Sequence, residues 1–325
     1  TTTAPNQFLI NAAGGVGIGT ESPSHMLTVG GNASIGGSAA ITVGVILSTG
    51  LILQAPRAVY ASGDLLYVAS YATNTLSVWD VSDPVNAILL GYQTSDLTGP
   101  NDLQVVGDRA YLASRNNDSL TVLDVSGPIY KGSIGAGTTY LNAPLGVHVS
   151  GKYAYVASSG DDGGDYDGLA VFDVTGRTIV ATDFITDNLD GTSDVFVSGS
   201  FAYVTSRNNN RLAVFDVSDP GEVLPVAYST ESLLAPVRVH VSGIYAYVVS
   251  RDNNRVVVYD VSSPAQITYV GEVATDLVQP RSIYVRGNRA YVAYAGQPGE
   301  GEGQGAQCGL AVLDISDPED IALLN

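Results

Sequence analysis

The chain has 325 residues, 45% of them hydrophobic and only 14% charged, with a formal net charge of −18. An acidic surface repels the phosphates of nucleic acids and anionic lipids, so we expect neither as a partner. A single cysteine excludes an intrachain disulfide. No apolar run reaches the 18 residues that a membrane span needs, and 37 glycines suit short strands and tight turns.

Residues 1–56 are predicted to form a β-rich arm that extends before the main domain. Between residues 7 and 53 the arm has one acidic residue, Glu21, and no lysine or arginine. Apolar residues alternate with small ones in several places, as in short strands. Such strands have open edges that pair with other strands, so we expect the arm to join subunits. The candidate assembly residues of the arm are Leu27, Val29, Ile35, Ile41, Val43 and Val45.

The stretch "GGVGIGTESPSHMLTVGGNASIGG" at 14–37 resembles the "VGIGT" segments of phage tail fibres and bacterial surface fibres. The resemblance covers roughly 30 residues. It implies a stalk or assembly element that forms β structure with neighbouring chains. A flexible leader, or an arm packed on its own domain, remains the alternative.

From residue 57 onwards the chain consists of six copies of one unit. Aligned on the tyrosine of "AYVAS", the copies are spaced by 44, 44, 48, 44 and 44 residues. Each copy divides into four strands separated by polar turns, and this period and strand number are typical of a β-propeller blade. We therefore predict an all-β fold, with a six-bladed β-propeller of four-stranded blades over residues 57–325. The aligned tyrosines are Tyr67, Tyr111, Tyr155, Tyr203, Tyr247 and Tyr291.

The third strand of each copy carries a second resemblance. The segments "LSVWDVSDP" at 76–84, "LAVFDVSDP" at 212–220 and "LAVLDISDP" at 310–318 are similar to those of LVIVD-repeat propellers and, more loosely, of "YVTN" surface-layer propellers. The resemblance covers about the last 270 residues. It implies a bladed propeller in an exported or surface-exposed setting, and no particular reaction.

The sixth copy stops within its fourth strand, which contains Ile321 and Leu323. A short last strand leaves an edge to which another strand can add. Either the arm of the same chain pairs there and latches the ring, or a strand of another subunit does. We include Ile321 and Leu323 among the assembly residues, and both alternatives stay open.

One face of the propeller is a candidate ligand site. The loops before strand one and between strands two and three emerge on the same face, and they are rich in Arg, Asn and Asp. Such groups bind carboxylates or sugars through several polar contacts. The alternative is that they only satisfy tight turns. The candidate ligand residues are Asn101, Asp102, Arg115, Asp194, Arg207, Arg238, Arg251 and Arg281, with Arg57 beside them.

An insertion in the third copy, "SSGDDGGDYDG" at 158–168, carries Asp161, Asp162, Asp165 and Asp167. Carboxylates on a glycine-rich loop suit a hard cation such as Ca²⁺, although the spacing is not that of an EF-hand. A solvated acidic loop is the alternative. No other cofactor is expected.

Two recurring features are interpreted as structural. The Asp of "DVS" recurs once per copy, and a strand-end hydrogen bond to backbone N–H groups explains it better than catalysis does. His148 and His240 occupy a position that is Tyr or Phe in other copies, which indicates packing between blades. No convergent catalytic set is apparent, so we expect no enzyme activity.

These observations predict an extracellular or cell-surface structural protein. Copies of the chain are expected to assemble into a fibre or array through the arm, by strand donation, and to display their propellers. A ligand- or glycan-binding adhesin is the second interpretation. A propeller hydrolase or lactonase ranks last, because it needs convergent polar groups at the channel mouth.

Overall fold

The computed structural model describes residues 8–11, 15–18, 27–29, 52–83, 86–126, 132–160, 166–274, 278–295 and 309–324. Two compact units are distinguished: residues 1–48 with 81–88, and residues 49–80 with 89–325. No helix in these ranges is long and apolar enough to cross a membrane. The prediction that Ile35, Ile41, Val43 and Val45 belong to an assembly surface lies outside the described residues.

The arm contains a small three-stranded sheet. Strand β2 (Gly15–Ile18) lies between β1 (Phe8–Asn11), to which it is antiparallel, and β3 (Leu27–Val29), to which it is parallel. Leu27 and Val29, two of the predicted assembly residues, lie at the ends of β3.

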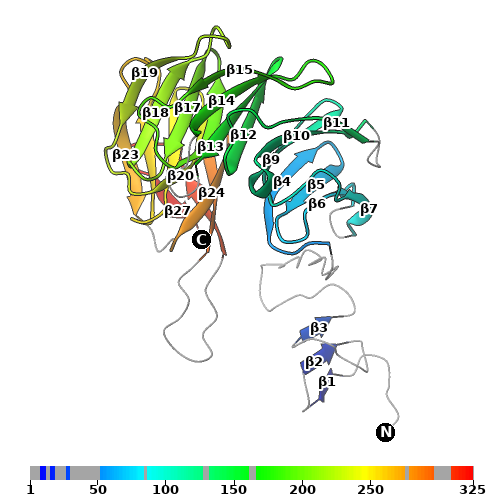
Figure 1. Ribbon diagram of the computed structural model, residues 1–325. Coiled ribbons are helices and arrows are strands. Elements are labelled where there is room, and N and C mark those ends of the chain that lie inside the picture. The colour runs from blue at the N-terminus through cyan, green and yellow to red at the C-terminus, as the bar shows by residue number, and fades with distance from the viewer. Residues whose placement is uncertain are drawn as a thin grey trace. The chain divides into compact units, whose positions relative to one another are not determined.

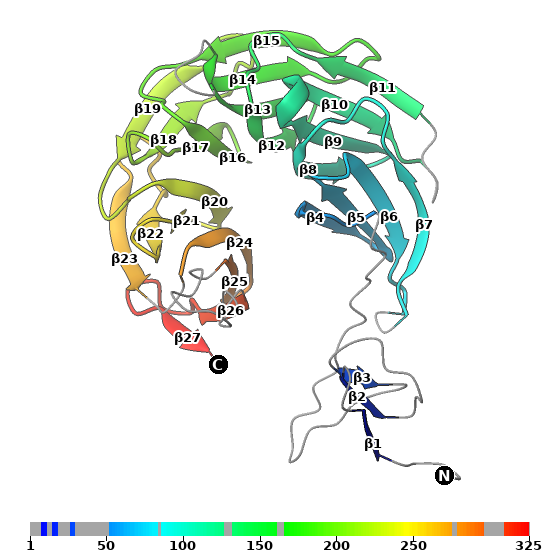
Figure 2. The same ribbon diagram turned by 60° about the horizontal axis from the view of Figure 1, so that its bottom comes forward.

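The second unit is all-β and consists of six four-stranded antiparallel sheets, so the prediction of a six-bladed propeller is confirmed (Figures 1 and 2). Blades one to three comprise β4 (Pro56–Ser62), β5 (Leu65–Ser70), β6 (Thr75–Asp80) and β7 (Ile88–Gln93); β8 (Pro100–Val106), β9 (Arg109–Ser114), β10 (Ser119–Asp124) and β11 (Gly132–Gly137); and β12 (Pro144–Ser150), β13 (Tyr153–Ser159), β14 (Asp167–Asp173) and β15 (Val180–Ile185).

Blades four to six comprise β16 (Thr192–Ser198), β17 (Phe201–Ser206), β18 (Arg211–Asp216) and β19 (Leu224–Ser229); β20 (Pro236–Ser242), β21 (Tyr245–Ser250), β22 (Arg255–Asp260) and β23 (Thr268–Ala274); and β24 (Pro280–Arg286), β25 (Arg289–Tyr294), β26 (Gly309–Asp314) and β27 (Ala322–Leu324). A 3-10 turn, η1 (Arg115–Asn117), lies between β9 and β10.

The first strand of each blade lies innermost, around the axis (Figure 2). Successive side chains of a strand point to opposite faces of the sheet, and the middle strands, such as β21 and β22, are buried on both sides. Each blade therefore has two apolar faces. The face towards the following blade is called the trailing face, and the face towards the preceding blade the leading face. Five separate core clusters fill the interfaces from blades one and two to blades five and six.

The turn between strands two and three joins each blade to the next. Asn74, Asn210 and Asn254 end this turn with φ of 54°, 57° and 57°, a left-handed conformation that Asn tolerates. Their side-chain Oδ1 atoms accept hydrogen bonds from the next blade's loop, at Gly99 N (2.8 Å), Ala235 N (2.8 Å) and Gln279 N (2.9 Å). The turn residues are therefore clamps between blades as well as turn formers.

The recurring Asp at the end of strand three is also structural, as predicted. Asp216, Asp260 and Asp314 each accept a hydrogen bond from the backbone N–H two residues further on, over 2.7–3.0 Å. Asp173 makes the same contact with Thr175 N, over 2.8 Å. This bond turns the chain out of the blade before the fourth strand.

The hydrogen bond from Ala235 N to Asn210 Oδ1 is expected to stabilise the propeller. Asn210→Gly keeps the left-handed turn but loses the bond to Ala235 N, and we expect it to lower the free energy of unfolding by about 1 kcal/mol. Asn210→Ala loses the bond and also strains the backbone, so a further loss of about 1 kcal/mol is expected. Urea denaturation measures both values. Equal stability of the wild type and both variants would contradict the clamp.

Candidate functional site

A β-bulge at the start of every inner strand builds the mouth of the central channel. In each inner strand the first and third residues pair with consecutive residues of strand two, and the second residue pairs with none. A bulge re-aims the extra side chain away from the sheet. The six bulged residues are Arg57, Asn101, Leu145, Ser193, Val237 and Arg281, and all of them line one cavity of about 620 Å³.

A second group of side chains reaches the same cavity from the turn after strand two. Arg115, Arg207 and Arg251 directly follow β9, β17 and β21 and line the cavity. The backbone N–H of each donates to a carbonyl of the loop before strand one of its own blade: Arg115 to Gly99 (3.0 Å), Arg207 to Gly191 (3.0 Å) and Arg251 to Ala235 (3.2 Å). These bonds fix the points from which the three arginines enter the cavity.

The cavity is strongly cationic although the chain is strongly acidic. Six of the twelve arginines line it: Arg57, Arg115, Arg207, Arg238, Arg251 and Arg281. Arg238 forms ion pairs with the carboxylates of Asp102 and Asp194, and Arg251 with that of Asp252. Burial, together with the charges of Arg251 and Arg57, lowers the pKa of Arg281, although the carboxylate of Asp252 partly offsets this. This arrangement attracts an anion.

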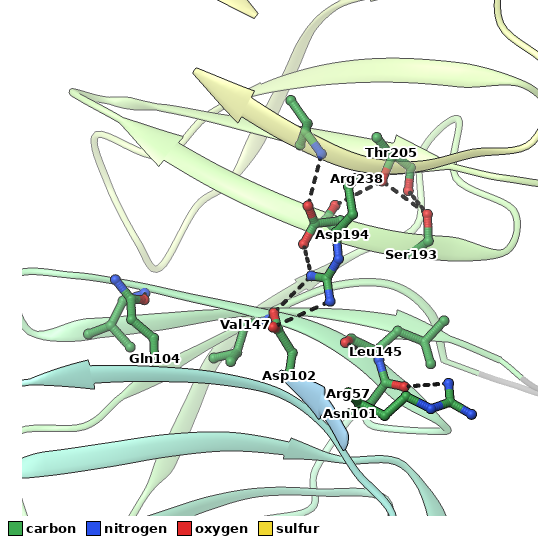
Figure 3. Close-up of polar contacts among 12 residues, drawn as sticks. Arg57, Asn101, Asp102, Gln104, Leu145, Val147, Ser193, Asp194, Thr205 and Arg238 are labelled. Carbon is green, nitrogen blue, oxygen red and sulfur yellow. Dashed lines mark hydrogen bonds and ion pairs between the residues drawn. The ribbon is translucent and has the colours of Figure 1, made fainter. Parts of the chain in front are cut away.

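Arg238, one of the residues that line the cavity, forms ion pairs with carboxylates of two other blades (Figure 3). Its Nη1 lies 2.8 Å from Asp194 Oδ1 in blade four and 3.1 Å from Asp102 Oδ2 in blade two. Each carboxylate also accepts a hydrogen bond from a backbone N–H group of the next blade. Asp194 Oδ2 accepts from Val239 N over 2.9 Å. Asp102 Oδ2 accepts likewise from Val147 N over 3.0 Å. Two predicted ligand residues, Asp102 and Asp194, are thus engaged inside the protein.

The ion pairs of Arg238 with Asp102 and Asp194 are called the bridge. Burial and the opposite charge of the partner have opposite effects on the pKa values of Asp194 and Arg238. Burial raises the pKa of Asp194 to about 6 despite the lowering effect of Arg238, and the charge of Asp102 raises it further. Burial alone lowers the pKa of Arg238, but the two carboxylates outweigh it and raise that pKa. Gly146 occupies the equivalent position in blade three, where a Cβ atom would lie 2.8 Å from Asp194 Oδ1. The bridge therefore requires glycine there.

The polar contacts of the bulged residues keep the rim of the cavity in place. Arg57 Nη1 donates to Asn101 Oδ1 over 3.2 Å, and its guanidinium lies 4.4 Å from the ring centre of Tyr71. Asn101 Nδ2 donates to Leu145 O over 2.6 Å. Arg281 Nη2 donates to Gln279 Oε1 over 3.0 Å.

Aromatic rings of successive inner strands contact one another. His148, Phe196, His240 and Tyr284 follow one another on β12, β16, β20 and β24, with ring centres 4.6, 4.8 and 5.4 Å apart. Burial lowers the pKa of His148 and of His240 to about 4, so both are neutral at pH 7. The prediction that these histidines pack between blades agrees with these contacts.

The predicted calcium loop is only partly described. Asp161, Asp162 and Asp165 lie outside the described residues, and among the residues that the structure describes no cluster of His, Cys, Asp or Glu is suited to a metal. Asp167 accepts hydrogen bonds from Thr192 N (3.0 Å) and Thr192 Oγ1 (2.8 Å) in the next blade. It acts as a clamp there, and calcium binding by the loop stays a prediction.

The bridge across the channel predicts a large effect of one substitution. Arg238→Met leaves two buried carboxylates without their cation, and we expect the free energy of unfolding to fall by about 3–5 kcal/mol. Changing Asp102 and Asp194 to Asn in the same variant removes the uncompensated charge and should restore most of the loss. Urea denaturation measures both, with exposed Arg286→Met as the control. An Arg238→Met variant as stable as the control would refute the role of the bridge.

Comparison with known proteins supports the fold and identifies the repeat. The family model described as "LVIVD repeat" matches residues 56–94, 100–133, 145–174 and 191–224. The model described as "Lactonase, 7-bladed beta-propeller" matches residues 222–300. A comparison with curated proteins gave no match.

Solved structures share the architecture at low sequence identity. A protein from Lactobacillus plantarum is 14% identical, with a TM-score of 0.66 over 83% of this chain and 84% of its own. A protein of unknown function from Desulfotomaculum acetoxidans is 13% identical, with a TM-score of 0.64 over 80% and 78%. A candidate 6-phosphogluconolactonase from Bacteroides uniformis is 15% identical, with a TM-score of 0.61 over 84% and 89%.

These comparisons change one expectation and support another. The prediction that the protein is not an enzyme is contradicted, because a lactonase propeller model matches 222–300 and candidate lactonases share the fold. That prediction relied on the lack of a recognisable catalytic set in the sequence. The bulged side chains lie far apart in the sequence and come together only in the folded ring. The predicted resemblance of the repeats is confirmed, because LVIVD repeats match four segments of this six-bladed β-propeller.

Proposed function

We propose that the channel mouth binds a small organic anion and that the protein hydrolyses an anionic lactone there. The observation that carries the proposal is the gathering of half of the arginines of an acidic chain around one cavity of about 620 Å³. A cavity of this size suits a sugar acid or its phosphate. The match of residues 222–300 to a lactonase propeller supports the reaction class.

The chemistry of lactone opening fits a cationic cavity. Water adds to the carbonyl carbon, the ring C–O bond breaks, and the leaving oxygen takes up a proton. Negative charge develops on the carbonyl oxygen during the addition, and fixed cations stabilise it. Arg207 and Arg251 are placed for this role or for holding the anionic group of the substrate, because their backbones are fixed by the loop bonds. The second candidate function is that of a glycan-binding adhesin. An adhesin would bind an acidic sugar through the same arginines.

The proposal is tested with a phosphorylated δ-lactone and its neutral analogue. We expect the wild type to release acid from the phosphorylated lactone in a pH-stat assay. Arg207→Gln with Arg251→Gln should lower kcat/KM for it by about 10- to 100-fold, with a smaller loss for the neutral lactone. Arg286→Gln, an exposed arginine outside the cavity, is the matched control.

A binding experiment separates the two parts of the proposal. Inorganic phosphate or citrate should raise the melting temperature of the wild type and of Arg286→Gln, and not that of the double variant. If the anions stabilise the wild type but no lactone is opened, hydrolysis is wrong and anion binding stands. If neither occurs, both are wrong.

We also propose that copies of the chain assemble outside the cell through the N-terminal arm. The supporting observation is the edge of blade six. In the described residues β27 pairs with Val312, Leu313 and Asp314 only, whereas each outer strand of blades four and five pairs with at least five residues of its neighbour. No described strand pairs with β26 on this side at Gly309–Ala311, and this is where the arm would add its strand. Of the predicted assembly residues at this end, Ile321 is buried in the core of its own propeller and Leu323 is exposed.

Deletion of residues 1–46 tests the assembly. Light scattering should show larger particles for the full chain than for the deleted chain, because the arm supplies the strand. If the deleted chain assembles to the same size, the arm is not the joining element.

A further inference from the structure

An exposed aromatic cluster lies on the outer side of blade three. Tyr140 comes from the loop before the blade, Tyr166 from the turn before β14, and Phe184 from the outer strand β15 (Figure 2). The ring of Tyr140 stacks on that of Phe184, with centres 5.2 Å apart and planes at 7°. The ring of Tyr166 lies 5.9 Å from Tyr140 and 5.8 Å from Phe184. Tyr140 and Tyr166 remain 39% and 45% exposed, and none of the three residues lines the cavity at the channel mouth.

Blades one, two, four and five have a polar contact where blade three has this cluster. In each of them a side chain of the turn donates to the backbone carbonyl 21 residues earlier, in the loop before the blade. The four pairs are Thr73 with Ile52 (2.8 Å), Asn117 with Asp96 (3.4 Å), Asn209 with Asn188 (2.9 Å) and Asn253 with Ser232 (2.8 Å). Tyr166 and Tyr140 occupy these two positions in blade three. Holding the loop on the turn therefore does not require aromatic residues.

Both tyrosines have an unfavourable backbone conformation. The φ angle is 60° at Tyr140 and 71° at Tyr166, which is the left-handed region. The positions equivalent to Tyr140 are left-handed too, but they carry the short polar residues Asp96, Asn188 and Ser232. A bulky side chain is disfavoured in this region, and strain of this kind is concentrated at functional sites. The two tyrosines are therefore not the residues that folding alone would favour.

Blade four shows what an aromatic ring at this place contacts. Tyr228 occupies the position of Phe184, and the guanidinium of Arg211 lies 4.5 Å from the centre of its ring. In blade three the position of Arg211 is taken by Gly168, where a Cβ atom would lie 2.9 Å from the ring of Phe184. Blade three thus keeps the ring, adds two tyrosines and has no cationic side chain at this position.

The sequence around the cluster is acidic. Residues 153–206 contain one basic residue, Arg177, which follows the end of β14 opposite to Tyr166. Tyr166 itself belongs to the aspartate-rich insertion at 158–168. An acidic region attracts cations, and a cation over an aromatic face is stabilised by the ring. Both features favour a cation over a neutral ligand.

We propose that the cluster of Tyr140, Tyr166 and Phe184 binds the guanidinium group of an arginine side chain of a partner polypeptide. The planar guanidinium stacks on the exposed tyrosine rings, as Arg211 does on Tyr228 within blade four. Small molecules are held in concave sites, whereas an exposed patch suits a side chain that a polypeptide presents. The site is separate from the anion site at the channel mouth and does not depend on hydrolysis there.

Binding of a blocked glycine–arginine–glycine peptide tests the inference, with citrulline in place of arginine as the neutral isostere. Titration followed by NMR should give a Kd of about 1–10 mM for the arginine peptide and no binding of the citrulline peptide. Tyr140→Asn with Tyr166→Asn recreates the Asn188 and Asn209 pair of blade four, and should weaken binding at least about 10-fold. Its melting temperature should equal or exceed that of the wild type, because the strain is relieved.

Two further variants separate ring chemistry from packing. Tyr140→Phe with Tyr166→Phe keeps the three rings and should bind the arginine peptide as the wild type does. Tyr92→Asn changes a tyrosine of the outer strand β7 that is 55% exposed and lies outside the cluster. It is the matched control and should also bind as the wild type does.

Three outcomes would overturn the inference. Equal binding of the arginine and citrulline peptides would show that the charge plays no part. Equal binding by the wild type and the Tyr140→Asn, Tyr166→Asn variant would place the site elsewhere. No binding by the wild type would leave the rings with a packing role only, and the same double variant should then melt at a lower temperature than Tyr92→Asn.

Discussion

A four-stranded blade with two apolar faces is not stable alone, and this constraint governs the whole molecule. Each blade buries its faces only against neighbours, so the propeller is a series of repeated interfaces. Hydrophobic burial supplies the attraction between blades, but it is non-directional. Direction comes from polar contacts that recur at fixed positions. In two examples, Asn210 Oδ1 accepts a hydrogen bond from Ala235 N and Asp194 Oδ2 accepts one from Val239 N. Both bonds set the angle between successive blades.

The channel mouth uses the same scaffold for a different purpose. Carboxylates at the paired positions, Asp102 and Asp194, are committed to the neighbouring blade and to Arg238. Of the other arginines at the cavity, Arg251 pairs with Asp252, and Arg57 and Arg281 donate to the neutral side chains of Asn101 and Gln279. Burial and the charges of Arg251 and Arg57 lower the pKa of Arg281. Structural charge is thus neutralised inside the protein, while the remaining positive charge faces the cavity. This division separates the residues that hold the ring together from those that face a ligand.

The fold was predictable from the sequence, and the site only in part. A period of 44 residues with four strands requires no knowledge of long-range contacts, because each repeat carries its own pattern of turns and apolar residues. The convergence of Arg57, Arg207 and Arg281 was suggested by the shared face of their loops. The bulge that directs Arg57 and Arg281 into the cavity was not recognised, although a proline followed by a polar residue at the start of strand one was its signal. The contact of Arg238 with Asp102 joins residues 136 positions apart, and nothing local in the sequence indicates it.

The bulge has a consequence for how such a protein changes over time. The bulged residue forms no pair with strand two, so the pairing of the sheet does not require one particular side chain there. The six blades already show this freedom, with Arg, Asn, Leu, Ser, Val and Arg at the one structural position. A propeller of this kind can exchange the chemistry of its channel mouth one blade at a time, while the interfaces that hold the ring together remain the same. Six positions that vary while the blade interfaces stay the same allow many combinations of side chains at the channel mouth.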